Sequence, residues 1–183
     1  FFSSATNGAM KAIRTNSGMI KKVYVPKYIY PLSSVLFNYI IFAISLIVLV
    51  VVSIVLKVYP TVYLLQAIIP LILLLITAFG VGMILSTMAV FFRDLEYLWS
   101  VGLMIIMYAS AIFYKPDRLL KSGFGWILKC NPLYLLIHNF RQAVFGMPMN
   151  MKFLAASVVF AIVSVIVGLV FFYKKQDEFI LHI

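Results

Sequence analysis

Long uncharged runs of apolar residues set the pattern of this chain. No charged residue lies between Lys27 and Lys57, or between Lys57 and Arg93. Each gap exceeds the roughly 20 residues that a helix needs to cross a hydrocarbon core of about 30 Å. The runs lack the alternation of apolar and polar positions that is typical of barrel strands, and in lipid only helices and closed barrels satisfy the backbone. The pattern therefore predicts membrane-spanning helices over 32–57 and 61–92.

Two shorter apolar runs follow. Residues 96–114 predict a span at the short end of the usual range, and residues 153–173 predict another. Residues 1–14 are expected to be the end of a preceding transmembrane helix, because they show neither an initiating Met nor the basic start of a signal peptide. The fold class is an all-α integral membrane protein with about four full transmembrane helices plus the end of a preceding one. We expect a single domain over 1–183.

Composition agrees with a membrane protein. Of the 183 residues, 64% are hydrophobic and only 11% are charged, far from the average for soluble domains. The net charge of +10 could suggest nucleic acid, but in so apolar a chain it indicates basic side chains that snorkel from span ends toward anionic head groups. We therefore expect membrane lipids as neighbours and no nucleic acid as a partner.

The predicted spans lack the chemistry that would drive transport by itself. Their interiors contain no Asp, Glu, Lys, Arg or His, the residues of proton relays and ion-coupling sites. The chain also has no G-x-x-x-x-G-K-[ST] phosphate loop, and its acidic residues do not form a pair suited to acid–base catalysis. An enzyme is not expected. The remaining candidates are the membrane half of a transporter driven by a separate motor, a channel, and a passive scaffold.

The stretch 15–31 is too polar for lipid and too aromatic for an ordinary solvated loop. Pro26 and Pro31 fix φ and remove backbone donors, so a helix is not expected to run unbroken from this stretch into the next span. Lysines could steer a partner and tyrosines could anchor it. The alternative is an interfacial aromatic belt with snorkelling lysines. The residues in question are Lys21, Lys22, Tyr24, Tyr28 and Tyr30.

Arg93 and Asp94 mark a boundary between two predicted helices. Arg93 closes one helix at its negative end, while Asp94 and Glu96 open the next at its positive end, each pairing worth about 0.3 to 1 kcal/mol. We expect this role to be structural, with a contact to a partner subunit as the alternative. Elsewhere, Ala78 and Gly82 belong to a row of small residues that permits close helix approach without indicating the partner helix.

The segment 115–152 carries a helix too short to cross the membrane. Asn131–Pro132 is a helix-start signal and Gly146 with Pro148 is a stop signal, and about 21 Å of helix fits between them. One stripe of this helix is apolar, and the other mixes aromatic and polar side chains that suit sugar rings and phosphates. Such a helix either lines a path or lies as a belt in the outer interface. The mixed stripe contains Tyr134, His138, Arg141, Gln142 and Phe145.

Single residues in this segment give weaker signals. No second His or Cys stands at ligand spacing from His138, so we expect a satisfied polar group there and no metal site. Cys130 is expected to be a small apolar residue. Basic residues are almost evenly divided between the two sides of the predicted topology, and the cluster over 11–27 favours the cytoplasm for its own side.

Several blocks, in order along nearly the whole chain, resemble the permease subunit of ABC-2 type exporters, in the branch that carries O-antigen, capsular polysaccharide or teichoic acid. The chain departs from that family at 109–112, where the family often has a small-Pro-Ile step, and this leaves the local bend open. Compared with the family, the chain is expected to lack an amphipathic amino-terminal helix, the first span and most of the second. The blocks are FFSSA, SGMIKKVYVPKYIYPLSSVL, FFRDLEYLW, CNPLYLLIHNFRQAVFG and FFYKKQDEF.

The resemblance implies a half-transporter with a cytoplasmic amino terminus. The stretch 15–31 would hold a coupling helix that docks on a cytoplasmic ABC ATPase subunit. The segment 115–152 would form a pair of outer re-entrant helices, the first over 117–130, and 174–183 would be a cytoplasmic tail. Residues expected along the translocation path are Trp126, Tyr134, His138, Arg141, Gln142 and Phe145. Those expected to be structural are Pro26, Pro31, Arg93, Asp94 and Pro132.

The implied assembly is a homodimer of the permease with two ATPase subunits. It would translocate a lipid-linked polysaccharide or teichoic acid polymer across the bacterial cytoplasmic (inner) membrane. We expect no cofactor bound by this chain, with ATP and Mg²⁺ in the partner subunit. The alternatives are an ABC-2 permease for a drug, haem or lipid, and a non-transporting membrane scaffold.

Overall fold

The computed structural model describes residues 1–23, 25–56, 62–114 and 125–179, and every regular element in these ranges is a helix. The expected all-α class is confirmed. The helices follow one another in the order α1 (Phe2–Thr15), α2 (Ser17–Ile20), α3 (Ile29–Val55), η1 (Val62–Ala67), α4 (Ile68–Phe91), α5 (Leu95–Ala109), α7 (Gly125–Cys130), α8 (Pro132–Val144), α9 (Met151–Lys175) and η2 (Gln176–Glu178).

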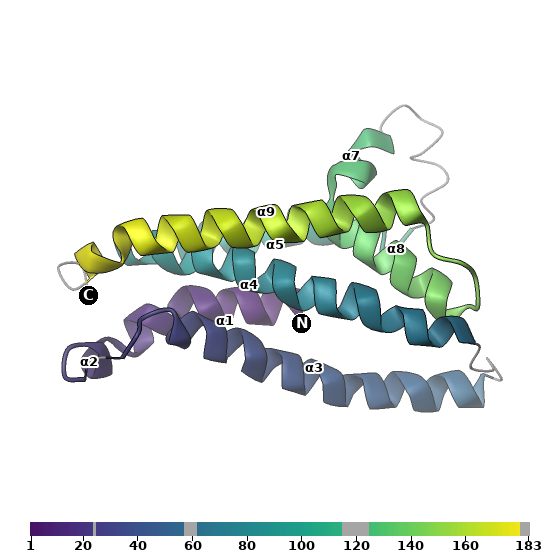
Figure 1. The fold of residues 1–183 in the computed structure, drawn as a ribbon, viewed down its shortest axis with the longest axis horizontal. Coiled ribbons are helices and arrows are strands. Elements are labelled where there is room, and N and C mark those ends of the chain that lie inside the picture. Colours follow the sequence, from purple (N-terminus) through teal and green to yellow (C-terminus); the bar gives the residue numbers. More distant parts are fainter. Residues whose placement is uncertain (24, 57–61, 115–124, 180–183) are drawn as a thin grey trace.

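The long helices lie side by side in an elongated bundle (Figure 1). Within the described ranges, three stretches are long and apolar enough to cross a membrane: Ile29–Val55, Tyr63–Phe91 and Met151–Glu178. The short helix α2 lies at one end of the bundle together with the end of α9, and α7 and α8 lie toward the other end (Figure 1). These two ends are called the α2 end and the α8 end below.

Helix α4 forms the centre of the bundle and packs chiefly against α9 and α1. The row of small residues in α4 faces α1, because a Cβ added at Gly82 would lie 2.9 Å from Ala9 Cβ. A second approach, at Gly80, faces α9. In lipid, helices associate by close van der Waals packing, and small residues allow it. The small residues of α4 thus have identified partners on two sides.

Helices α3 and α5 lie at the margins of the bundle. In α3 only Tyr30, Pro31 and Val35 are buried, and Ile47 and Val48 are 62% and 64% exposed. None of the 15 residues of α5, all of them described, is buried. Such apolar faces suit lipid or further helices.

Two of the sequence expectations need correction. Helix α3 begins at Ile29, before the predicted start of the span at 32, so Pro31 lies in its first turn. The expected interruption before the span is present, because α2 ends at Ile20. The first-turn N–H groups have no intrahelical acceptor, and a proline there loses nothing. The predicted span 96–114 ends early, at Ala109, and Ala111 has φ 49°. The chain therefore turns at this point without the proline that the family often has.

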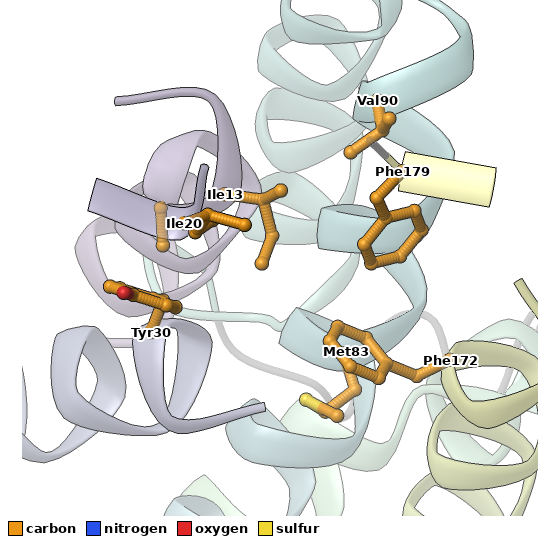
Figure 2. Packing of buried hydrophobic residues seen from close by; sticks show 8 residues of the cluster. Ile13, Ile20, Tyr30, Met83, Val90, Phe172 and Phe179 are labelled. Carbon is orange, nitrogen blue, oxygen red and sulfur yellow. The ribbon is translucent and has the colours of Figure 1, made fainter. Parts of the chain in front are cut away.

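A hydrophobic cluster closes the α2 end (Figure 2). It joins α1, α2, α3, α4 and α9 to the last described turn of the chain, where Phe179 is fully buried. The Phe179 ring makes edge contacts with Phe172 and Phe91, at centroid distances of 5.2 and 6.2 Å. The labelled members are Ile13, Ile20, Tyr30, Met83, Val90, Phe172 and Phe179.

Candidate docking and transport surfaces

The stretch between α1 and α3 presents one buried and one exposed side. Helix α2 starts after Asn16, whose Nδ2 donates to the carbonyl oxygen of Ala12 at 2.8 Å. Ile20 is 8% exposed and belongs to the hydrophobic cluster, whereas Met19 and Val23 are 57% and 53% exposed. This segment, residues 17–23, is called the α2 segment below. Ile20 anchors it in the cluster, and Met19 and Val23 form an exposed apolar pair on its other side.

The expected docking residues divide between these two sides. Lys21 and Lys22 are exposed, next to Met19 and Val23. Tyr28 is half-buried and packs against the cluster, and Tyr30 is 8% exposed within it. We therefore remove Tyr30 from the docking surface, because α3 begins early enough to turn this ring into the interior. Tyr24 lies outside the described residues.

A polar contact holds residues 26–28, which lead into α3, against the end of α9. Lys27 Nζ donates to the carbonyl oxygen of Gln176 at 2.6 Å and lies 5.9 Å from the centroid of the Phe179 ring. Pro26, expected to be structural, is exposed just before it. Residues 26–28 are therefore held to the end of α9 as well as joined to α3.

The boundary between α4 and α5 falls where the sequence predicts it, between Phe91 and Leu95. Arg93 and Asp94 are exposed, and Asp94 caps α5 without a side-chain hydrogen bond. Glu96, in the first turn of α5, pairs with two basic residues of α1. Its Oε2 lies 3.2 Å from Lys11 Nζ, and its Oε1 accepts from Arg14 Nη2 at 2.5 Å.

Helix α8 starts and ends at the predicted signals. Asn131 Oδ1 accepts from the backbone N–H of Leu133 at 3.0 Å, and Pro132 occupies the first turn. The helix ends at Val144, followed by Gly146 at φ 71°. Asn131 Nδ2 also donates to Ser110 Oγ at 3.0 Å, which ties the start of α8 to the end of α5.

An apolar cavity of about 590 Å³ lies between α1, α3, α4, α5 and α8. It is the apolar stripe of α8 that faces this cavity. The mixed stripe lies elsewhere on the helix. From α8, the lining residues are Leu133, Leu136, Ile137 and Phe140.

The mixed stripe of α8 is partly interior. Tyr134 is 3% exposed and packs on Phe153 of α9, with ring centroids 6.2 Å apart. Tyr134 is thus an interior residue of this protomer, and its place along the translocation path stays a prediction. His138 also packs edge-on against Phe153, at 5.1 Å. Burial, and next the charge of Arg141, hold the pKa of His138 below its usual value, so the imidazole is neutral at pH 7.

The other expected path residues lie nearer the surface. Arg141 is exposed, and its Nη1 donates to the carbonyl oxygen of Ala111 at 3.5 Å. Gln142 Oε1 accepts from the backbone N–H of Asn150 at 3.1 Å. Phe145 and Trp126 are 65% and 63% exposed. Arg141, Phe145 and Trp126 are therefore the predicted residues available to a passing molecule at the α8 end.

Comparison with known proteins decides the family. Residues 1–145 match the model of the ABC-2 type transporter. The chain belongs to the ABC-2 type transporter family. Two proteins of Klebsiella pneumoniae, each described as O-antigen export system permease protein RfbA, are 34% and 33% identical to it over 181 residues. The matches cover 98% of this chain and 69% of each relative.

Three features of this ABC-2 permease differ from the expectations or were not among them. Met19 and Val23 were overlooked beside the tyrosines, although two apolar residues four apart in a polar stretch give a usable signal. Cys130, expected to be a small apolar residue, is an exposed free thiol. The partners of Glu96 gave no signal at all, since Arg14 lies 82 positions away.

Proposed function

We propose that this permease is the membrane subunit of an ATP-driven exporter that moves a lipid-linked polysaccharide or teichoic acid polymer across the bacterial cytoplasmic membrane. The observation that carries the proposal is its similarity, over 98% of its length, to permeases named for O-antigen export. The transport role follows from the family, and the polymer is inferred from the relatives.

Energy would come from a cytoplasmic ABC ATPase that binds ATP and Mg²⁺. The three long apolar stretches carry no Asp, Glu, Lys, Arg or His in their interiors that could couple transport to an ion gradient. The exposed side of the α2 segment suits a protein partner, because Met19 and Val23 offer apolar contact beside the charges of Lys21 and Lys22. In the proposed orientation, the α2 end lies in the cytoplasm and the α8 end outside.

A polymer route between two copies of the permease is the simplest arrangement. Helix α5 leaves its whole length accessible in one protomer, and Leu98 and Ile105 are 69% and 64% exposed. A two-fold pair of such faces would enclose a path that one chain cannot enclose alone. At the outer end, Trp126 and Phe145 would stack on sugar rings and Arg141 would hold a phosphate.

One observation favours a second candidate. The cavity of about 590 Å³ has a lining that is almost wholly apolar, which suits a free lipid or a lipophilic drug. The same cavity would also accept the lipid part of a lipid-linked polymer.

Deletion of the permease gene in its host tests the function. We expect surface polymer to disappear and lipid-linked polymer to accumulate inside the cells, with both effects reversed by the wild-type gene. A matched complementation uses Met19→Glu with Val23→Glu, which should be made in normal amounts and restore nothing. Normal surface polymer in the deletion strain would contradict the proposal, and altered resistance to lipophilic compounds there would favour the second candidate.

A further inference from the structure

Helix α5 is held to the rest of the permease by few contacts. It has no buried residue among its 15, and its contacts with α1 and α4 include its first turns. There, Leu95 and Trp99 pack against Met10, Leu85 and Ala89. Trp99 Nε1 donates to Thr6 Oγ1 at 3.1 Å. The position of α5 thus depends on this small set of contacts near its start and on the hydrogen bond between Ser110 and Asn131 at its end.

Glu96 is the charged member of that set. Its side chain is 23% exposed, and each carboxylate oxygen forms an ion pair with one basic side chain of α1. Lys11 and Arg14 are three residues apart on α1, so they share one face of that helix. Neutralising Glu96 would leave these two cations side by side without their counter-charge. The Lys175–Glu178 pair, in contrast, joins residues within one short segment of the same end.

The two helices joined by Glu96 lead to different functional surfaces. Helix α1 continues through Asn16 into the α2 segment, whose exposed side is the proposed contact surface for the ATPase. Helix α5 lines the apolar cavity with Leu103, Met104 and Met107. Its far end meets the start of α8 through Ser110 and Asn131.

We propose that Glu96 is a positioning residue that couples the docking segment to α5. When the ATPase subunit displaces α2 and α1, the pairs with Lys11 and Arg14 move α5 with them and change the cavity-lining face. This inference rests on the proposed function, since it requires an ATPase subunit at the α2 end. These pairs are partly exposed, at 23% for Glu96, 34% for Arg14 and 54% for Lys11, and partly screened pairs contribute modestly to stability. Glu96 therefore acts on orientation more than on folding. Coupling free energies of this kind correspond to effects of about 5-fold or more.

The experiment uses the full-length permease in membranes with the ATPase subunit that co-purifies with it. Polymer exported per ATP hydrolysed is measured for wild type, Glu96→Gln, and the double variant Lys11→Gln with Arg14→Gln. We expect both variants to keep wild-type amounts of complex and basal ATP hydrolysis, and to lose about 5-fold or more in polymer per ATP. Glu178→Gln is the matched control, because it removes a surface carboxylate at the same end, and it should change nothing.

A charge swap separates coupling from mere structure. Arg14→Glu with Glu96→Arg rebuilds an ion pair between α1 and α5, and we expect it to recover most of the polymer per ATP that Glu96→Gln loses. A second readout follows the labelling rate of Met104→Cys in a Cys130→Ala background. ATP should change this rate in the wild type and in the swap, and change it about 5-fold less in Glu96→Gln.

The outcomes distinguish failure of the Glu96 proposal from failure of the proposed exporter function. If no ATPase subunit co-purifies or wild type exports no polymer, the proposed function fails. If wild type exports and Glu96→Gln keeps the wild-type ratio, the Glu96 proposal alone is overturned. Should Glu96→Gln lose the complex, the swap decides: recovery supports coupling and no recovery overturns it.

Discussion

Gly80 of α4 and Gly168 of α9 bring two helix backbones into direct contact. A Cβ added at Gly168 would lie 2.5 Å from the carbonyl oxygen of Gly80, and one added at Gly80 would lie 2.5 Å from the carbonyl carbon of Ser164. The obstacle in both cases is backbone, which cannot rotate away as the end of a side chain can. The close approach of α4 and α9 therefore requires glycine at these two positions.

We expect Gly168→Ala to destabilise the permease by about 1 to 3 kcal/mol through overpacking. Gly18→Ala is the matched control, since nothing lies within 4 Å of a Cβ there, and it should be neutral or slightly stabilising. Thermal unfolding of the detergent-solubilised protein, followed by the size-exclusion peak, gives the two midpoints. Equal midpoints would contradict the tight contact.

Tyr30 provides a test of the interior placement that replaces its expected docking role. Its hydroxyl is buried and has no hydrogen-bond partner among the residues that the structure describes. Tyr30→Phe removes an unsatisfied polar group and should be neutral or slightly stabilising, whereas Tyr30→Ala should cost about 3 to 5 kcal/mol. Unfolding midpoints distinguish the two variants. Loss of ATPase binding in a stable Tyr30→Phe protein would show that the hydroxyl reaches the partner after all.

The exposed side of the α2 segment should behave as a protein interface. We expect Met19→Ser with Val23→Ser to reduce the ATPase recovered with the permease by about 10-fold or more, since buried anchor residues often contribute 2 kcal/mol or more to binding. Lys21→Gln with Lys22→Gln should instead slow association, with a loss that shrinks at high salt. Pull-down at two ionic strengths measures both. Wild-type recovery for the apolar pair would exclude this surface from docking.

The orientation of the bundle can be tested with the native thiol. Cys130 is exposed and is the last residue of α7, which lies toward the α8 end (Figure 1). In the proposed topology it reacts with an impermeant maleimide added outside spheroplasts. Lys22→Cys, in a Cys130→Ala background, should react only after permeabilisation. The opposite pattern of labelling would reverse the topology and remove the α2 surface from the cytoplasm.

Exposed and buried residues at the outer end, on α8 and just after it, should respond differently to substitution. Arg141→Ala with Phe145→Ala should lower polymer export while the amount of complex stays normal, because both side chains are exposed. Tyr134→Ala should lower the amount of folded protein instead, since that ring is 3% exposed. Surface polymer normalised to complex measures the difference. Full export by the Arg141, Phe145 double variant would leave this face as an interfacial belt.

Hydropathy and helix signals predict much of this fold, because they act locally. The charge-free gaps correspond to α3 and α4, and Asn131–Pro132 opens α8 as expected. The end of α5 at Ala109 was missed, since Ala111 at φ 49° is an uncommon backbone conformation that no residue type there announces.

The direction in which side chains face was harder to predict. Tyr30 and Tyr134 belong to the residue type that interfaces and interiors both use, and only the packing of α3 and α8 decides between the two. Small residues in α4 showed that a close contact exists, whereas Ala9 and Gly168 as its partners depend on tertiary structure. The same holds for Glu96 and Arg14.

Helices α4 and α5 differ in how closely neighbouring helices pack against them, and this difference decides where substitutions are tolerated. Around α4, at Gly80 and Gly82, added atoms meet α9 and α1 at once, so substitution there is penalised whatever is transported. Along α5, residues such as Leu98 and Ile105 can change in size without disturbing a neighbour within the protomer. Within one protomer, side-chain size is therefore constrained by close contacts at Gly80 and Gly82 but not at Leu98 and Ile105.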